Sequence, residues 1–220
     1  MSKIAIILGA TGLTGEILLQ RLLNDDRYSK IKLFSRNSVA NSHPKIEEYL
    51  IDLLKLEKYS ACFTGDEVFC CIGTTASKTP DKKLYREIDY GIPVAAAHLC
   101  LQNNIKTIVI ISALGANAKS NISYNKIKGE MEDTILSLAI DKTHFLQPSL
   151  IGGTRSEKRM GEYLFKQFMK IVNPLLVASL KKYRSIHPDT IVYAMIWIAN
   201  NKYYNEKVIS DEIKEIARNS

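Results

Sequence analysis

The sequence contains few cysteines, the residues that stabilise small secreted domains through disulfides and small metal-binding domains through metal ligation. Its 220 residues include four cysteines, six prolines and one tryptophan. The cysteines are Cys62, Cys70, Cys71 and Cys100, and none of them forms a Cys-x-x-Cys pair. This spacing excludes a typical zinc site and a disulfide framework. We therefore expect buried free thiols in a reducing compartment.

Long hydrophobic runs are also absent. No apolar stretch reaches the ~18 residues that a membrane-spanning helix needs. The apolar run at 4–8 leads directly into glycines and Glu16, without the full apolar region and cleavage site of a signal peptide. We expect a cytoplasmic protein with no membrane span.

Acidic residues are fewer than basic residues. The chain has 30 lysines and arginines against 23 aspartates and glutamates, a formal net charge of +7. Residues 142–184 contain nine of the basic and two of the acidic residues, so this one segment accounts for the whole excess. A surface that meets an anionic substrate or an acidic partner would explain this basic cluster, and so would a solvent-exposed helix face. No nucleic-acid recognition motif accompanies it, so we expect no nucleic-acid partner.

Length and patterning indicate the fold class. A chain of this length suits one domain, residues 1–220. We expect strands at 3–8, 31–34, 46–51, 68–72, 107–111, 143–147 and 207–210, and helices at 15–24, 82–103, 121–138, 188–200 and from 211. This alternation predicts an α/β fold, a doubly wound parallel sheet with helices on both faces. Residues 149–185 break the rhythm, and we expect them to form a small substrate-covering elaboration within the domain.

A glycine-rich loop stands between the first expected strand and the first expected helix. It reads Gly-Ala-Thr-Gly-Leu-Thr-Gly at positions 9–15. Glycines here permit a tight turn, close approach of a pyrophosphate and close packing of the helix on the strand, and the helix N-terminus attracts phosphate. The loop therefore predicts dinucleotide binding by Gly9, Thr11, Gly12, Leu13, Thr14 and Gly15.

The end of the second expected strand indicates which dinucleotide binds. An acidic residue here would hold the ribose hydroxyls of NAD, whereas an arginine accommodates the additional phosphate of NADP. The sequence has Ser35 and Arg36 and no carboxylate nearby, and an arginine can pair with a phosphate through two hydrogen bonds. NADP(H) is therefore favoured over NAD(H), although an ordinary surface arginine would look the same.

Two further strand ends contribute candidate cofactor contacts. Asp52, with Leu53 beside it, follows the third expected strand and would accept a hydrogen bond from the adenine. A helix N-cap is the alternative for Asp52. Gly73, Thr74 and Thr75 follow the fourth expected strand, at the carboxyl edge where ligands of such sheets bind. A tight turn would explain Gly73 equally well.

A Tyr-x-x-x-Lys pattern occurs three times, and its context separates the copies. The pairs are Tyr28/Lys32, Tyr124/Lys128 and Tyr203/Lys207. Only the second lies on an expected helix, where residues i and i+4 share a face. Only this pair also follows a strand that ends in a serine, Ser112.

Ser112, Tyr124 and Lys128 together suit proton transfer. A free tyrosine has a pKa near ~10, and an ammonium group within ~4–6 Å lowers such a pKa by ~1–3 units. Tyr124 would then exchange a proton with a substrate oxygen that Ser112 holds, while hydride moves to or from a nicotinamide. Lys128 would also hold the nicotinamide ribose. A half-buried tyrosine with a solvated lysine beside it is the alternative.

Five motifs spread along the chain carry a family resemblance. They are the glycine loop, Phe-Cys-Cys-Ile-Gly-Thr-Thr at 69–75, Tyr-Asn-Lys-Ile-Lys-Gly-Glu at 124–130, Gln-Pro-Ser at 147–149 and His-Pro-Asp at 187–189. Together they resemble an atypical short-chain dehydrogenase/reductase, of the Tat-interacting-protein type with its bacterial NAD(P)-binding relatives. The resemblance implies a Rossmann-type fold, bound NADP(H), the Ser-Tyr-Lys roles above, and a nicotinamide pocket lined by the backbone of Pro148.

The chain departs from the family at two points. The second serine that often ends the fifth strand is replaced by Ala113, and no asparagine of the family's proton relay can be identified. We predict an NADP(H)-dependent oxidoreductase that acts on a small carbonyl or alcohol, anionic if the basic cluster faces it. The alternatives are an NADP(H)-bound sensor or partner-binding protein without catalysis, and an enzyme of the nucleotide-sugar epimerase/dehydratase type. The oligomeric state stays open, with a homodimer among the options.

Overall fold

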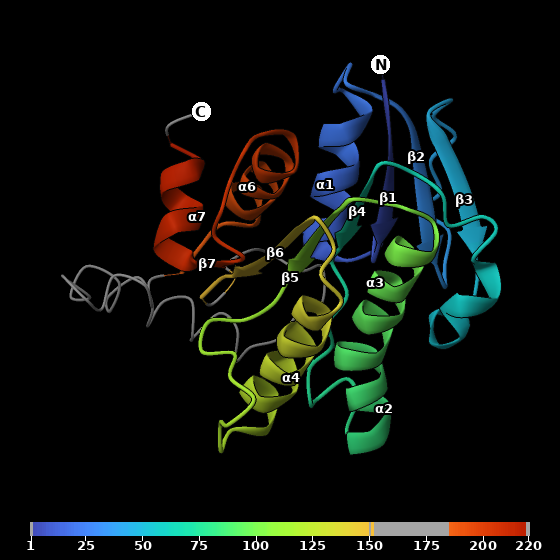
Figure 1. Cartoon of the computed structure of the whole chain (residues 1–220). Helices are drawn as coiled ribbons and strands as arrows, with labels where there is room; N and C mark the ends of the chain where they lie inside the picture. The colour runs from blue at the N-terminus through green and yellow to red at the C-terminus, as the bar shows by residue number, and fades with distance from the viewer. Residues whose placement is uncertain (1, 150, 152–184, 219–220) are drawn as a thin grey trace.

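The computed structural model describes residues 2–149, 151 and 185–218, and it places their strands in one parallel sheet. The strands are β1 (Lys3–Leu8), β2 (Tyr28–Ser35), β3 (Ile46–Leu50), β4 (Glu67–Cys70), β5 (Thr107–Ile111), β6 (Lys142–Gln147) and β7 (Lys207–Ile209). Their order across the sheet is β3-β2-β1-β4-β5-β6-β7 (Figure 1). The predicted doubly wound α/β fold is thereby confirmed.

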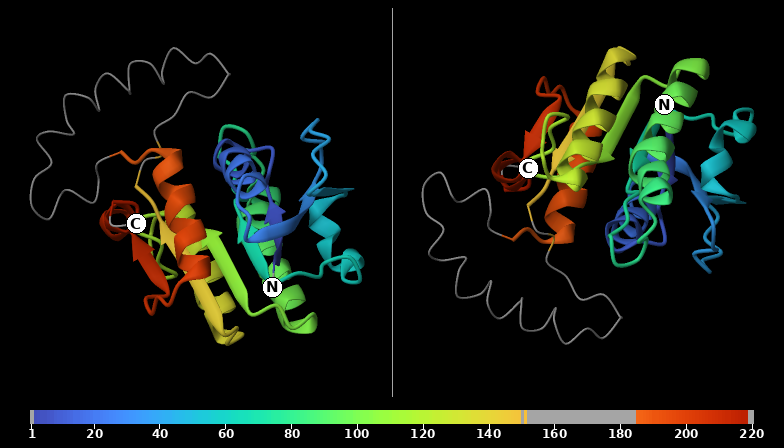
Figure 2. Two further views of the ribbon diagram at one scale, coloured as in Figure 1. Left: turned by 90° about the horizontal axis from the view of Figure 1, so that it is seen from above. Right: turned by 90° about the horizontal axis from the view of Figure 1, so that it is seen from below.

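Helices cover both faces of this sheet. One face shares a hydrophobic cluster with α1 (Leu13–Leu23), α6 (Pro188–Asn200) and α7 (Ser210–Ile216). The opposite face shares a second cluster with η1 (Leu53–Tyr59), α3 (Ile92–Gln102) and α4 (Ser123–Ser137). The two layers can be followed in the views from above and below (Figure 2). We call them the α1–α6 layer and the α3–α4 layer.

The central strands bury both of their faces, as a sheet between two helical layers requires. In β1, Ile6 and Leu8 pack in the α3–α4 layer, whereas Ala5 and Ile7 pack in the α1–α6 layer. All four are fully buried, and burying one isoleucine or leucine side chain contributes about 1.5–3 kcal/mol. The alternation fixes the register, because a shift of one residue would exchange the two faces.

The strand order reverses between β1 and β4, and this reversal places the site. β1 pairs with β2 on one side and with β4 on the other. In open parallel sheets, ligands bind beyond the carboxyl ends of the strands at such a reversal. The glycine loop follows β1 and residues 71–75 follow β4, so both lie at this edge.

The helix expected at 82–103 is interrupted. It consists of α2 (Lys82–Arg86), a single π-helical turn named η2 (Glu87–Gly91), and α3. Pro93 lies at the start of α3 and has no N–H to donate to the carbonyl four residues earlier, that of Asp89. The wider π turn accommodates this loss. Asp89, within the turn, is fully buried.

The other expectations about the fold are met in part. Cys70 and Cys100 are buried free thiols, but Cys62 and Cys71 are only partly buried, because they lie in the turns that follow η1 and β4. The elaboration expected at 149–185, with most of the basic cluster, lies almost wholly outside the described residues. None of the described helices has the length and hydropathy to span a membrane.

A buried polar network lies at the amino ends of the central strands. Glu67 of β4 is 2% exposed and accepts a hydrogen bond from the Tyr28 hydroxyl at 2.6 Å. Lys3 of β1 also pairs with Glu67. Asn200, at the end of α6, donates to the Tyr28 oxygen at 2.7 Å. The network ties α6 to three strands, and removal of one partner would leave a buried charge less well compensated.

Candidate active site

The loop between β1 and α1 needs its glycines for different reasons. Gly9 has a φ of 88°, in the left-handed region that glycine adopts most readily. A Cβ on Gly15 would lie 2.1 Å from the carbonyl oxygen of Gly9, so only glycine lets α1 pack this closely on the loop. A Cβ on Gly12 would meet only that same oxygen, at 3.3 Å, and would otherwise face open space. That open side leaves room for a ligand to approach the backbone.

The N-terminus of α1 is suited to an anion. Gly12 is its N-cap and provides no side-chain cap for the first-turn N–H groups. Those groups and the helix dipole favour a negatively charged ligand. Loop and helix together therefore fit the pyrophosphate of a dinucleotide. Of the other predicted loop residues, Thr11 is exposed, Leu13 is half-buried and Thr14 is buried.

The end of β2 presents an exposed cation. Arg36 is exposed, whereas Ser35 is 2% exposed. The Ser35 hydroxyl donates to the carbonyl oxygen of Asn37 at 2.8 Å. Because the serine proton is already used within the loop, Arg36 is the better placed of the two to meet a phosphate.

Asp52 caps η1. Its carboxylate accepts a hydrogen bond from the backbone N–H of Leu54 at 3.1 Å and lies 3.3 Å from Lys55 Nζ. The Leu54 N–H, then Lys55 and, least, Arg36 lower the pKa of Asp52. The structure thus shows the capping alternative, and a contact between Asp52 and adenine stays a prediction. Leu53 is buried in the α3–α4 layer.

A buried ion pair joins α4 to η2. Lys128 Nζ lies 3.0 Å from Asp89 Oδ1, and the two side chains are 2% and 1% exposed. Asp89 Oδ2 accepts a hydrogen bond from the backbone N–H of Thr74 at 2.8 Å. Gly73 lies against the pair, because a Cβ there would be 3.9 Å from Lys128 Nζ. The loop after β4, η2 and α4 therefore meet at Lys128, and Thr75 lies exposed beyond them.

Tyr124 occupies the first turn of α4, one turn before Lys128. It is 40% exposed, so a ligand can reach it. Burial, first, and the negative charge of Asp89, second, raise the pKa of Tyr124 to about 12. In the ligand-free protein the pKa of Tyr124 is thus raised and not lowered, because Lys128 is paired with Asp89. A lowering by Lys128 together with a bound, oxidised nicotinamide stays a prediction.

Ser112 belongs to a second buried group of polar side chains, around Glu132. The Ser112 hydroxyl donates to Glu132 Oε1, and Gln147 Nε2 donates to the two carboxylate oxygens at 2.9 and 3.0 Å. Lys207 Nζ lies 3.1 Å from Glu132 Oε2. Ser112 and Glu132 are 3% and 0% exposed. Since a hydroxyl has one proton, Ser112 can offer a substrate only its acceptor lone pairs while it donates to Glu132.

Two carboxylates at the site were not predicted. Tyr124, Lys128 and Glu132 follow one another at intervals of four residues on α4, so the helical pattern could have indicated Glu132. Asp89 leaves no such signal, because its position depends on the π turn before Pro93. It is nevertheless the residue that pairs with Lys128.

The loops after β5 and β6 close this edge of the sheet. A Cβ on Gly129 of α4 would lie 2.2 Å from the backbone of Asn117 and Ala118, so the glycine of the Lys-Gly-Glu motif lets the loop after β5 pack on the helix. The backbone N–H of Leu114 donates to the carbonyl oxygen of Pro148 at 3.0 Å. Pro148 thus lies beside the end of β5, with its carbonyl already bonded within the protein.

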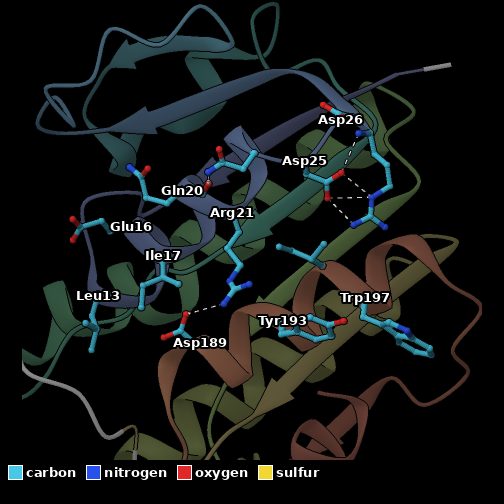
Figure 3. Close-up of a pocket in the computed structure, with 13 residues that line it drawn as sticks. Leu13, Glu16, Ile17, Gln20, Arg21, Asp25, Asp26, Asp189, Tyr193 and Trp197 are labelled. Carbon is cyan, nitrogen blue, oxygen red and sulfur yellow. Dashed lines mark hydrogen bonds and ion pairs between the residues drawn. The ribbon is translucent and has the colours of Figure 1, made fainter. Parts of the chain in front are cut away.

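A hollow of about 1040 Å³ lies in the other layer, between α1 and α6 (Figure 3). Tyr193 and Trp197 of α6 line it, together with Arg21 and Asp189, which are 3.2 Å apart. Of the predicted site residues, the hollow includes Leu13 alone. It is therefore distinct from the surroundings of Tyr124, on the opposite side of the sheet.

No family model matches the sequence, but individual proteins do. The chain is 31% identical to the protein HTATIP2 of Rattus norvegicus over 171 residues, which cover 76% of this chain and 70% of that protein. It is 33% identical to the mitochondrial protein FMP52 of Candida albicans over 158 residues, which cover 69% of this chain and 68% of that protein.

Solved structures share the fold. A UDP-N-acetylglucosamine 4-epimerase from Methanobrevibacter ruminantium, solved with UDP-N-acetylmuramic acid, matches with a TM-score of 0.70 and 17% identity over 97% of this chain and 80% of that chain. The protein MoeE5, solved with UDP-glucose and NAD, matches with a TM-score of 0.68 and 15% identity over 98% of this chain and 81% of that chain. At these identities the likeness concerns the fold alone.

The relatives correct one prediction. The FMP52 proteins of Candida albicans, Eremothecium gossypii and Scheffersomyces stipitis are named mitochondrial, so the prediction of a cytoplasmic protein is wrong. It rested on free thiols and on the lack of a signal peptide. Neither feature separates one intracellular compartment from another, because location is read from address segments and not from the folded domain.

Proposed function

We propose, since the chain belongs to the atypical short-chain dehydrogenase/reductase family of HTATIP2 and FMP52, that it is an NADP(H)-dependent oxidoreductase acting on a small carbonyl or alcohol. One observation carries the proposal: the loop after β4 lies against both the glycine loop and the start of α4. A Cβ on Gly9 would lie 2.9 Å from the carbonyl oxygen of Cys71, and Gly73 lies against Lys128. The glycine loop and the first turns of α4, which carry Tyr124 and Lys128, are therefore neighbours at one sheet edge.

The residues at this edge fit a nicotinamide dinucleotide. The open side of Gly12 and the α1 N-terminus would hold the pyrophosphate, and Arg36 would pair with the 2′-phosphate of NADP. Gly73 and Thr74 would line the nicotinamide half. When bound, the cofactor supplies a reversible two-electron transfer of hydride.

The protein's own residues would handle the proton. Tyr124 would exchange it with the substrate oxygen through the phenol group. Lys128, held by Asp89, would bind the nicotinamide ribose. Ser112 would accept a hydrogen bond from a hydroxyl group of the substrate or product, because its own proton is given to Glu132.

Cofactor preference can be tested by measuring the affinities of NADPH and NADH. Arg36→Ala should weaken NADPH binding about tenfold or more, since a hydrogen bond to a charged group contributes about 1.5–3 kcal/mol. NADH binding should not change. Arg21→Ala is the matched control, an exposed arginine whose partner is Asp189, and it should leave both affinities unchanged. Equal NADPH affinity in wild type and Arg36→Ala would contradict the assignment.

Catalysis can be tested by following NADPH oxidation with a panel of aldehydes and ketones. Tyr124→Phe should lower turnover by about 10²–10⁴-fold, the usual contribution of a positioned acid or base, and should keep NADPH affinity. Tyr204→Phe is the control, because Tyr204 is 87% exposed. Turnover that survives Tyr124→Phe would remove Tyr124 from the mechanism. NADPH binding without turnover of any carbonyl would favour the sensor alternative.

A further inference from the structure

The two carboxylate oxygens of Asp89 are engaged unequally. Asp89 is fully buried, and its Oδ2 accepts a hydrogen bond from the backbone N–H of Thr74 at 2.8 Å. Oδ1 lies 3.0 Å from Lys128 Nζ as an ion-pair partner, yet it accepts no hydrogen bond from any residue that the structure describes. A buried carboxylate oxygen without a hydrogen-bond donor is rare and calls for an explanation. A ligand that donates a hydrogen bond to Oδ1 supplies one.

Room for such a ligand lies beside Gly73, in the loop after β4. Gly73 is exposed, so a ligand can reach it. A Cβ on Gly73 would lie 3.6 Å from Asp89 Oδ1 and 3.9 Å from Lys128 Nζ, both ordinary van der Waals distances. Apart from these two atoms and the chain neighbours of Gly73, it would meet no described atom within 4 Å. The open space therefore borders on one hydrogen-bond acceptor, the carboxylate oxygen, and on one donor, the ammonium group.

This combination of charges is suited to a hydroxyl group. A hydroxyl group can donate its proton to Asp89 Oδ1 and accept a hydrogen bond from Lys128 Nζ at the same time. A phosphate at this position would be repelled by the carboxylate of Asp89, and an ammonium group would be repelled by Lys128. The chemistry of the pair therefore favours an uncharged ligand group that carries both a donor and an acceptor.

We infer, on the basis of the proposed binding of NADP(H), that Asp89 is a cofactor-binding residue whose Oδ1 accepts a hydrogen bond from a hydroxyl group of the nicotinamide ribose. This ribose is joined directly to the pyrophosphate, which the glycine loop would hold. The loop after β4 connects the two positions, because Cys71 lies against Gly9 and Gly73 lies against the ion pair. Lys128 would bind the same ribose from the other side. Since the two charges compensate each other, Asp89 adds little repulsion for the pyrophosphate.

The test compares two ligands by isothermal titration calorimetry. NADPH contains the nicotinamide ribose, whereas adenosine 2′,5′-bisphosphate is a fragment of it that ends before this ribose. Asp89→Asn should weaken NADPH binding about tenfold or more, because a hydrogen bond to a charged group is lost. Asparagine keeps one acceptor oxygen, so it cannot serve the Thr74 N–H and the ribose as the two carboxylate oxygens do. The affinity of the fragment should not change.

Two further variants complete the test. Glu87→Gln is the matched control, because Glu87 lies in the same π turn but is 45% exposed, and it should change neither affinity. Gly73→Ala leaves both charges in place, and its Cβ would make only van der Waals contacts, but it would occupy the space of the ribose. It should weaken NADPH binding and keep both the affinity of the fragment and the Tm of the ligand-free protein. If Asp89→Asn does not fold, Gly73→Ala decides alone.

The results that overturn the inference differ from those that overturn the proposed function. Wild-type NADPH affinity in Asp89→Asn or in Gly73→Ala overturns the assignment of the ribose to Asp89. An equal loss of affinity for NADPH and for the fragment in Asp89→Asn also overturns it, because the carboxylate would then be structural. Failure of the wild-type protein to bind NADPH removes the proposed function, and the inference with it.

Discussion

Replacing Gly12 by alanine should abolish cofactor binding and leave the fold intact. Gly12 has φ −87° and ψ 164°, an extended conformation that alanine adopts without strain. The added Cβ would meet only the carbonyl oxygen of Gly9, at 3.3 Å. This contact needs an adjustment of a few tenths of an ångström, which we place at about 1 kcal/mol, the low end for overpacking. The methyl group would, however, occupy the open side on which the pyrophosphate approaches the backbone.

The effect can be measured by thermal unfolding with and without NADPH. A ligand at 100 times its Kd stabilises the folded state by about 2.7 kcal/mol. For 220 residues, each kcal/mol shifts Tm by about 2–4 °C. Wild type should therefore gain about 5–11 °C from NADPH at that concentration. Gly12→Ala should gain nothing, with a ligand-free Tm within about 4 °C of wild type.

Two other glycines make the assay specific. Gly91→Ala is the neutral control, because a Cβ at Gly91 would meet nothing within 4 Å, and it should show the full gain from NADPH. Gly15→Ala should unfold at lower temperature whatever ligand is present, because its Cβ would lie 2.1 Å from the Gly9 carbonyl oxygen. A full NADPH gain in Gly12→Ala would refute our account of the loop.

Three further predictions concern buried polar groups. Tyr28→Phe deprives Glu67 of a hydrogen-bond donor. It should lower the free energy of unfolding in urea by about 1–3 kcal/mol and leave NADPH affinity unchanged. A smaller loss of stability would mean that water replaces the hydroxyl group. His144 is buried with its Nε2 unpartnered in the described part of the chain, and burial lowers its pKa. The unfolded chain then binds the proton more readily, so stability should fall as pH drops through about 6.5. His144→Phe should reduce this dependence of stability on pH. The same dependence in the variant would assign it to other titratable groups. Glu132→Ala removes the acceptor of the Ser112 proton and should reduce turnover with NADPH affinity unchanged. Wild-type turnover in this variant would remove Glu132 from the positioning of Ser112.

The fold was predictable because its signals are local. The expected strands at 3–8, 68–72 and 107–111 are short, nearly all-apolar runs, and each is followed directly by a glycine or a serine. The strand expected at 31–34 extends to Tyr28–Ser35, because Tyr28 at its start is buried by a partner on another strand. Such pairings depend on residues far apart in the chain, so the sequence predicts the element better than its ends.

The pairing of charges was not predictable in the same way. Tyr124 and Lys128 are recognisable from their spacing, but the charge that acts on the tyrosine comes from Asp89, 35 positions earlier. A π turn brings it there, and helical periodicity does not describe a π turn. Ser112 was likewise recognisable, and the helical spacing indicates Glu132, but the hydrogen bond between them depends on how α4 packs against the end of β5.

Binding and chemistry use charge in opposite ways at this sheet edge. On the α4 side Lys128 is paired with Asp89 and Glu132 with Lys207, so these charges add little net attraction for an anion. On the α1 side the helix N-terminus and the exposed Arg36 are positive. We therefore expect the attraction of an anionic cofactor to come from the α1 side. A substitution that alters one side should leave the other working, because no ion pair joins the two sides within residues 2–149, 151 and 185–218.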